Sequence, residues 1–145
     1  RGELELRFGP ARHYGPAGGV VGRDPAGARL LYSGDTGPND DLAVAAAGAD
    51  LLVCEATLGL VDEDGPDRGH LTADEAIALA SAARPRATLL THYPSDRRAA
   101  LVRAAARAPV PVAVARPGMA LAIDAPVPGE AAHRSGDTVQ LSPST

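Results

Sequence analysis

The sequence predicts an α/β domain whose sheet is partly parallel. Three segments with strand patterns come first, and from residue 40 onward helical patterns alternate with short apolar runs. Strands that alternate with helices are typical of parallel β-α-β units, because a crossover must carry the chain back before the next parallel strand begins. The predicted order is β-β-β-α-β-α-β-α-β-β. With 145 residues, 45% of them hydrophobic, the chain can bury one core.

The first three predicted strands follow from alternation and turn signals. Residues 3–8 read Glu-Leu-Glu-Leu-Arg-Phe, the alternation of a half-buried strand. Residues 18–21 and 29–33 are short apolar runs on either side of the turn sequence Asp-Pro-Ala-Gly, which predicts a hairpin. Asn39 is a favourable N-cap for a helix over residues 40–47, which has two aspartates at its start and a glycine after its end.

The second half alternates between buried strands and amphipathic helices. Residues 50–55 (DLLVCE) form a continuous apolar run, as expected of a strand that is covered on both faces. Thr72 and Glu75 are spaced as a capping box, which predicts a helix that ends near Arg84. The remaining predicted elements are strands at residues 87–91, 110–115 and 120–123, and a helix over residues 96–107 that is capped by Ser95.

We predict that the folded domain comprises residues 1–124. From Pro126 the composition turns to Pro, Gly and Ser without hydrophobic periodicity, so residues 125–145 are predicted to be a disordered tail. The chain starts at Arg1 without a methionine and enters a strand pattern at once. We therefore expect it to be the later part of a longer protein.

Composition argues against several functional classes. No stretch of 18 apolar residues is present, so no membrane span is predicted. The single cysteine, Cys54, cannot form an intrachain disulfide, which favours a reducing cytoplasm. The net charge of −4, without a basic stripe, is unfavourable for nucleic-acid binding, which depends on phosphate neutralisation. All fourteen basic residues are arginine, a bias that points to a bacterium with GC-rich DNA.

Polar residues of metal-ligand type stand at the ends of three predicted strands. Asp35 and His92 each follow an apolar run, and Glu55 ends another. Ligands of open α/β sheets gather at the carboxyl ends of strands, so we expect these three side chains to lie together. Imidazole and carboxylate are the ligand set of zinc and similar divalent ions. Position alone leaves alternatives open, because Asp35 could hold an Asx turn and Glu55 could orient an imidazole from behind.

Four motifs in order, "YSGDTGP", "LLVCEATL", "RGHLTADEAIALA" and "LLTHYP", are more specific than these positions. Together they resemble the second half of metallo-β-lactamase-fold hydrolases of the ribonuclease Z-like group, over residues 13–123. The resemblance implies that the chain is half of a four-layer αββα sandwich. It also implies a hydrolase with two divalent metal ions, zinc or manganese, that cleaves a phosphodiester.

The resemblance assigns a role to each candidate residue. His13, Asp35 and His92 correspond to metal ligands, and Asp35 corresponds to the carboxylate that bridges the two ions. His70 corresponds to a histidine that is not a ligand and acts on the leaving group, as suits the residue type that titrates near neutral pH. The residues expected to support the ligands from behind are Glu55 and Thr36.

Two departures from the family pattern shape the expected function. The family's H-x-H-x-D-H motif, which supplies four further ligands, is absent from these 145 residues. The chain alone is therefore not expected to be competent, and an alternative is a non-catalytic fragment or binding module with an incomplete metal site.

The second departure concerns residues 19–35, which form a plain hairpin where tRNA-processing members carry a long arm that grips tRNA. Together with the acidic balance, it favours a small or cyclic nucleotide as substrate. A ribonuclease Z-type endonuclease that processes tRNA is the alternative. No membrane partner is expected, and a homodimer is compatible with the sequence.

Overall fold

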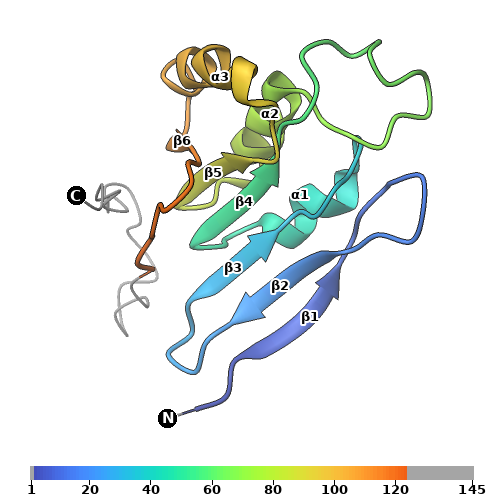
Figure 1. The fold of residues 1–145 in the computed structure, drawn as a ribbon. Coiled ribbons are helices and arrows are strands. Elements are labelled where there is room, and N and C mark those ends of the chain that lie inside the picture. Colours follow the sequence, from blue (N-terminus) through green and yellow to red (C-terminus); the bar gives the residue numbers. More distant parts are fainter. Residues whose placement is uncertain (1, 124–145) are drawn as a thin grey trace.

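Figure 1 shows the computed structural model, which describes residues 2–123. This part of the chain forms one six-stranded sheet in which the order of the strands equals their order along the chain. The elements are β1 (Glu5–Gly9), β2 (Gly19–Arg23), β3 (Arg29–Tyr32), α1 (Asp40–Ala46), β4 (Leu51–Glu55), α2 (Ala73–Ala83), β5 (Ala87–Thr91), the 3-10 turn η1 (Ser95–Arg97), α3 (Arg98–Ala105) and β6 (Val112–Val114).

The sheet is mixed, as the sequence predicts. β1, β2 and β3 are antiparallel neighbours, whereas β3, β4, β5 and β6 run parallel. Each parallel connection passes through a helix, and the three helices lie on one face of the sheet (Figure 1). The core lies between that face and the helices, with Leu31, Leu52 and Leu90 of the strands packed among helix residues such as Leu42 and Leu101. The predicted α/β class is confirmed.

The local signals that start the helices behave as predicted in two cases. Asn39 accepts a hydrogen bond from the Asp41 backbone N–H at 3.0 Å and caps α1. Thr72 and Glu75 form the full capping box of α2. That helix ends at Arg84, which adopts the left-handed conformation with φ 51°.

Two sequence-based expectations near the end of the domain are wrong. Ser95 caps no helix, because the chain already turns into η1 at that residue and its side chain makes no capping hydrogen bond. Residues 120–123 form no strand. The chain turns through Gly118 (φ 78°), with the Met119 N–H bonded to the Arg116 carbonyl, and does not come back alongside β6.

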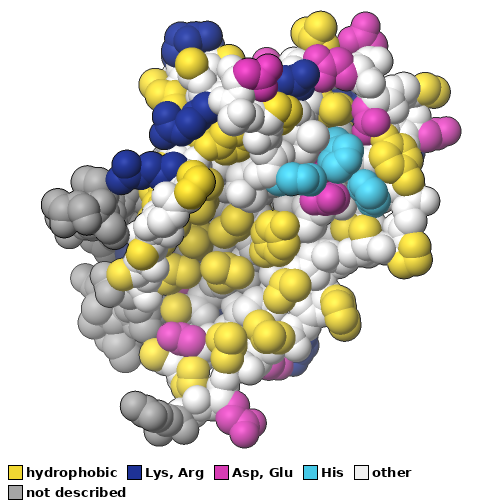
Figure 2. Space-filling model, in the orientation of Figure 1, with side chains coloured by type: hydrophobic (Ala, Val, Ile, Leu, Met, Phe, Trp, Pro, Cys, Tyr) yellow, Lys and Arg dark blue, Asp and Glu magenta, His cyan; other side chains and the backbone are white. Residues whose placement is uncertain are grey.

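The face of the sheet opposite the helices is uncovered in the described part. Leu4, Leu6 and Phe8 of the first strand region and Tyr32 of β3 lie on it, and Phe8 is 93% exposed. Figure 2 shows hydrophobic side chains gathered over this face, with histidines at its edge. Such an apolar sheet face normally packs against a second layer, so the described residues form two layers of the predicted four-layer sandwich.

Three further sequence-based expectations concern the tail, membrane spans and the single cysteine. The predicted tail from residue 125 lies outside the described residues. Within residues 2–123, no helix is long and apolar enough to cross a membrane. Cys54 is a buried free thiol whose pKa is raised to about 12 because burial disfavours the thiolate, so it acts as a small core residue.

Candidate metal centre

The carboxyl ends of β3, β4 and β5 bring three of the predicted residues together. These strands are parallel neighbours, so the residues that follow them reach the same edge of the sheet. Glu55 lies beside Thr91 in register, which places His92 one residue beyond Glu55. Asp35 follows β3 after a short turn, and its Oδ1 lies 2.9 Å from the Nδ1 of His92. The expected juxtaposition of Asp35, Glu55 and His92 is therefore present.

The other two histidines reach this edge from loops. His13 lies in the β1–β2 connection, and His70 lies just before α2. The ring centroids of His13 and His70 are 5.0 Å apart, and those of His70 and His92 are 5.7 Å apart. Figure 2 shows these imidazoles side by side at the rim of the uncovered sheet face. The structure thus places His70 between two residues that the sequence predicts as ligands.

Glu55 lies beneath the histidines, at the end of β4, and its carboxylate is hydrogen-bonded to His70 and to the neighbouring backbone. Its side chain is fully buried. Oε1 accepts hydrogen bonds from the Thr36 N–H at 2.7 Å and from His70 Nδ1 at 2.9 Å, and Oε2 accepts one from the Thr57 N–H at 3.2 Å. Because a carboxylate can only accept here, Nδ1 of His70 carries the proton and Nε2 is left for chemistry. Glu55 therefore joins His70 to the chain at Thr36 and Thr57, and its role behind the metal ligands stays a prediction.

Replacing Glu55 with alanine is expected to destabilise the full-length protein by about 3 kcal/mol. The change leaves the buried N–H of Thr36 and the partly buried N–H of Thr57 without their acceptor, and loss of the acceptor of a buried N–H costs about 1–3 kcal/mol. Denaturant unfolding measures the effect. Glu3→Ala is the matched control, because Glu3 is exposed, and it should leave the unfolding midpoint unchanged. An equal effect of both substitutions would show that Glu55 does not organise the site.

Thr36 connects the end of β3 with the loop that carries His13. Its Oγ1 accepts a hydrogen bond from the Arg12 N–H at 2.9 Å and donates one to the Gly37 carbonyl at 2.9 Å. The Gly37 N–H donates to the Arg12 carbonyl at 2.7 Å. His13 directly follows Arg12, so these bonds fix its backbone relative to Asp35. Thr36 therefore ties the His13 loop to the end of β3, and its role behind the metal ligands stays a prediction.

The backbone around His92 is strained. His92 has φ 49°, a left-handed conformation that residues other than glycine adopt rarely. The Thr57 hydroxyl donates to the His92 carbonyl at 2.8 Å, and the Ala56 N–H donates to the Thr91 carbonyl at 3.0 Å. These bonds from the β4 end hold His92 in place. Strained residues of this kind concentrate at functional sites, where the surroundings impose the geometry.

The donor atoms are close enough together to hold a divalent ion. Those of His13, Asp35 and His70 lie within 4.8 Å of one another, and so do those of Glu55, His70 and His92. Imidazole nitrogen and carboxylate oxygen are the donors that zinc and manganese take in proteins, so the residues present fit such a metal. Asp35 and His92 are also half-exposed, so an ion or substrate can reach them.

Sequence reasoning missed two residues that border the site. The Tyr14 ring lies 4.9 Å from that of His13 and 6.3 Å from that of His70. A hydrogen bond between the side chains of Tyr14 and Asp64 raises the pKa of Tyr14 and lowers the pKa of Asp64. Asp64 also accepts from the Gly69 N–H at 3.0 Å. In the sequence, residues 59–69 (GLVDEDGPDRG) contain several acids, but nothing in this run indicates that Asp64 is the one that turns towards the site.

Gly69 itself sits where a side chain cannot. A Cβ at this position would lie 2.7 Å from Cδ2 of His13, closer than real Cβ atoms approach, and 3.0 Å from the Tyr14 ring, which is tighter than most Cβ contacts. The backbone just before His70 therefore packs directly against the His13 and Tyr14 rings. This close approach is a physical reason for the glycine of the "RGH" motif.

Comparison with known proteins now identifies the family. A family model described as "Beta-lactamase superfamily domain" matches residues 2–93, which include every candidate site residue. The chain belongs to this family. The expected relationship to metallo-β-lactamase-fold, ribonuclease Z-like proteins is thereby confirmed, and this fold implies a divalent metal centre.

Relatives of this beta-lactamase superfamily domain include a ribonuclease Z from Halobacterium salinarum, 43% identical over 77 residues that make up 52% of the chain and 25% of the relative. An uncharacterized protein of Mycobacterium leprae is 48% identical over 71 residues, 49% of the chain and 25% of the relative. The match thus spans about a quarter of the length of these curated relatives.

Solved structures give the same fold. The metallo-beta-lactamase fold protein YhfI of Bacillus subtilis superimposes with a TM-score of 0.68 and 25% identity, over 80% of this chain and 48% of YhfI. The short form of human tRNase Z superimposes with a TM-score of 0.61 and 23% identity, over 83% of this chain and 43% of that structure. The chain therefore matches about half of each of these folds, in agreement with the two layers described above.

Proposed function

We propose that this chain forms the carboxyl-terminal half of a dinuclear-metal hydrolase that cleaves a phosphodiester in a small or cyclic nucleotide. The observation that carries the proposal is the meeting of three imidazoles and two carboxylates at one edge of the sheet, with donor atoms within 4.8 Å in two overlapping groups. Imidazole and carboxylate donors this close together can hold divalent ions. The proposal takes His13, Asp35 and His92 as the ligands and reserves His70, which both groups share, for proton transfer.

The proposed ligands are His13, Asp35 and His92. Asp35 lies with His13 in one group of donors and contacts His92 directly, so its two oxygens can face two ions. A single imidazole offers one lone pair to a metal and cannot bridge in this way. When bound, two divalent ions would supply positive charge to the phosphoryl group and favour a nucleophilic water near neutral pH.

His70 is proposed to move the proton. Its Nδ1 is held by the buried carboxylate of Glu55, so the ring is fixed and Nε2 points away from that bond. In this role a proton passes from Nε2 of His70 to the departing oxygen of the phosphodiester. The proposal therefore requires that the departing oxygen of the bound substrate lies within hydrogen-bond distance of Nε2.

The remaining ligands would come from outside these 145 residues, since the H-x-H-x-D-H motif is not among them. Because the match spans about a quarter to a half of its relatives, the activity proposed here is that of the whole protein. The uncovered apolar sheet face, with Phe8 and Leu6 exposed, supports the presence of a second half, which a four-layer sandwich would pack there.

A second candidate function is tRNA processing. It is favoured by the names of the ribonuclease Z relatives, which are 38–44% identical over the matched region. The structure favours the small substrate instead. β2 and β3 are joined by the tight turn at residues 24–28, in which the Asp24 N–H donates to the Ala28 carbonyl at 3.0 Å, and no arm extends from it.

Parallel assays of the full-length protein distinguish these candidates. We expect hydrolysis of bis(p-nitrophenyl) phosphate and of a cyclic nucleotide, complete loss after treatment with a chelator, and recovery with zinc or manganese. Cleavage of a tRNA precursor with no turnover of the small diesters would favour the endonuclease. Metal-loaded protein that hydrolyses none of these substrates would contradict the hydrolase and support a binding module.

A further inference from the structure

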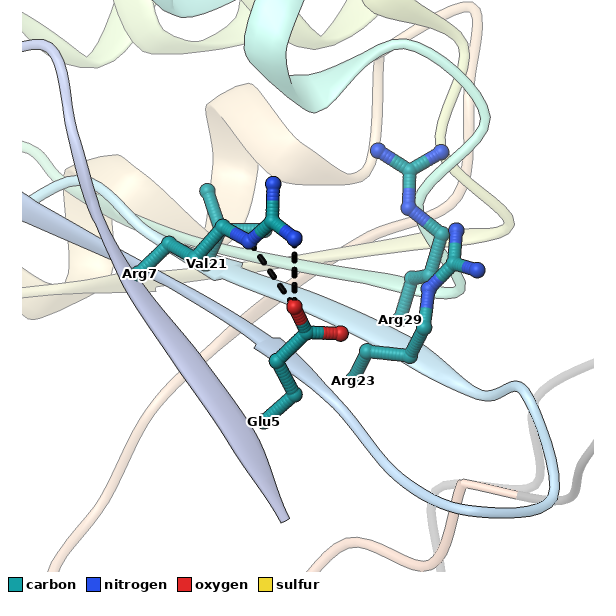
Figure 3. Close-up of a pocket in the computed structure, with 5 residues that line it drawn as sticks. All are labelled: Glu5, Arg7, Val21, Arg23 and Arg29. Atoms are coloured by element: carbon teal, nitrogen blue, oxygen red, sulfur yellow. Dashed lines mark hydrogen bonds and ion pairs between the residues drawn. The ribbon is translucent and has the colours of Figure 1, made fainter.

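A groove separate from the candidate metal centre lies beside the first three strands. It is lined by Glu5, Arg7, Val21, Arg23 and Arg29 and has a volume of about 300 Å³ (Figure 3). We call it the arginine groove. Three arginines against one glutamate leave two positive charges in excess, although the chain as a whole carries −4. The local charge is therefore opposite to that of the chain.

The register of the sheet explains how these side chains meet. Arg7 lies opposite Val21, which packs against the core on the helix-covered side, so the groove opens on that side. Arg29 begins β3, whereas Asp35 follows the end of the same strand. Six residues at about 3.3 Å each separate them by roughly 20 Å. The arginine groove and the metal centre are thus at opposite ends of β3.

Glu5 neutralises one arginine and leaves the other two. Oε1 of Glu5 accepts from Arg7 Nε at 2.9 Å and from Arg7 Nη2 at 2.5 Å (Figure 3). Glu5 is also opposite Arg23 across the β1–β2 pair, but its carboxylate turns to Arg7. Among residues 2–123, no carboxylate lies within ion-pair distance of the guanidinium group of Arg23 or Arg29.

Arg23 and Arg29 are direct cross-strand partners in the antiparallel β2–β3 pair. Figure 3 shows their guanidinium groups side by side and pointing the same way. Like charges directly opposite on neighbouring strands destabilise a sheet. Arg29 is nevertheless held in place, since its Nη1 donates to the Ala47 carbonyl at the end of α1 at 3.2 Å. Two neighbouring guanidinium groups, neither of them ion-paired among the described residues, form a site that an anion would stabilise.

We propose that the arginine groove binds a phosphate group through Arg23 and Arg29. Planar guanidinium groups match the oxygens of phosphate with paired hydrogen bonds, which a lysine cannot provide. Arg7 is a third potential hydrogen-bond donor to the phosphate, but its guanidinium group is bonded to Glu5. The same chemistry serves a free phosphate compound and the backbone of a nucleic acid, so the test includes one probe of each kind.

The test is a calorimetric titration of the full-length, metal-loaded protein with inorganic pyrophosphate at low salt. Wild-type protein should bind one more pyrophosphate per chain than the Arg23→Gln/Arg29→Gln variant, whose groove affinity should fall at least tenfold. Arg103→Gln/Arg107→Gln is the matched control, because it removes the same charge from two exposed arginines at α3. Equal losses in both double variants, or no difference between wild type and the groove variant, would overturn the proposal.

Two further variants sharpen the test. Glu5→Gln should tighten pyrophosphate binding several-fold, because it releases Arg7 into the groove. Unchanged or weaker binding would contradict the role given to Arg7. Arg23→Gln alone covers the case in which the double variant does not fold, since Arg23 makes no side-chain bond within the described residues. It should weaken pyrophosphate binding while leaving phosphodiester hydrolysis unchanged.

A short single-stranded RNA, followed by fluorescence anisotropy, distinguishes the source of the phosphate. Loss of RNA binding in the groove variant but not in the α3 control assigns the groove to a nucleic-acid backbone. Pyrophosphate binding without RNA binding assigns it to a free phosphate compound. If neither probe distinguishes the groove variant from the control, the arginine pair is only a solvated surface and the proposal is wrong.

Discussion

Replacing Asp35 with alanine is expected to abolish hydrolysis and to remove at least one metal ion from the full-length protein. Asp35 is the residue whose donor atoms lie with those of His13 on one side and contact His92 at 2.9 Å on the other. Within the described part of the chain, the other carboxylate of the centre, Glu55, is fully buried and already bonded to Thr36, Thr57 and His70, so it cannot take the place of Asp35. We expect turnover to fall by roughly 10³-fold or more, since a single electrostatic stabiliser is already worth about 10²–10³-fold.

The control for Asp35→Ala is Asp62→Ala, which removes an exposed acid of the 59–69 loop. Asp62→Ala should retain both activity and metal content. Asp35 is half-exposed, and the ion pair that its side chain makes among the described residues is with the half-exposed His92, so its loss should leave the unfolding midpoint close to that of the wild type. Wild-type turnover in Asp35→Ala would contradict the bridging role.

Replacing His70 with alanine should slow turnover by roughly 10²–10⁴-fold while the protein keeps its metal ions. This is the usual scale for loss of a general acid. The geometry supports that role, because the bond from Nδ1 to Glu55 fixes the ring and leaves Nε2 for the substrate. The variant should also lose the limb of the pH–rate profile that depends on a protonated histidine, whereas a purely structural role would leave the shape of the profile unchanged.

The competing possibility for His70 is direct ligation. Its donor atoms lie within 4.8 Å of those of His13 and Asp35, and also of those of Glu55 and His92. Measuring metal in His70→Ala alongside His92→Ala separates the two roles. We expect metal to be retained in His70→Ala and lost in His92→Ala. Loss of metal from both variants would make His70 a ligand.

The edge of the sheet could be predicted because parallel strands place their carboxyl ends together. Once residues 50–55 and 87–91 are recognised as buried strands, Glu55 and His92 must lie near each other. The capping box at Thr72 was equally accessible, because all of its atoms come from one short stretch of sequence. Local patterns and sheet topology were therefore sufficient for the order of the elements up to β6 and for the meeting of Asp35, Glu55 and His92, whereas His13 and His70 were indicated only by the family resemblance.

The remaining features depend on contacts between distant segments. The Arg12–Thr36 hydrogen bond joins residues 24 positions apart, and neither residue type indicates the pairing. The Arg23–Arg29 pair depends on a strand register that is set by the turn between β2 and β3. Residues 120–123 have the alternation of a strand, but strand formation needs an available neighbour, and the chain does not return to β6.

The central claim is a two-metal centre in which Asp35 is the bridging ligand. Elemental analysis by mass spectrometry of the full-length protein, purified without added metal and compared with its Asp35→Ala variant, tests it most directly. We predict about two divalent ions per chain in the wild type and at most about one in the variant. Fewer than two ions in an active wild-type protein, or an unchanged metal content in Asp35→Ala, would contradict it.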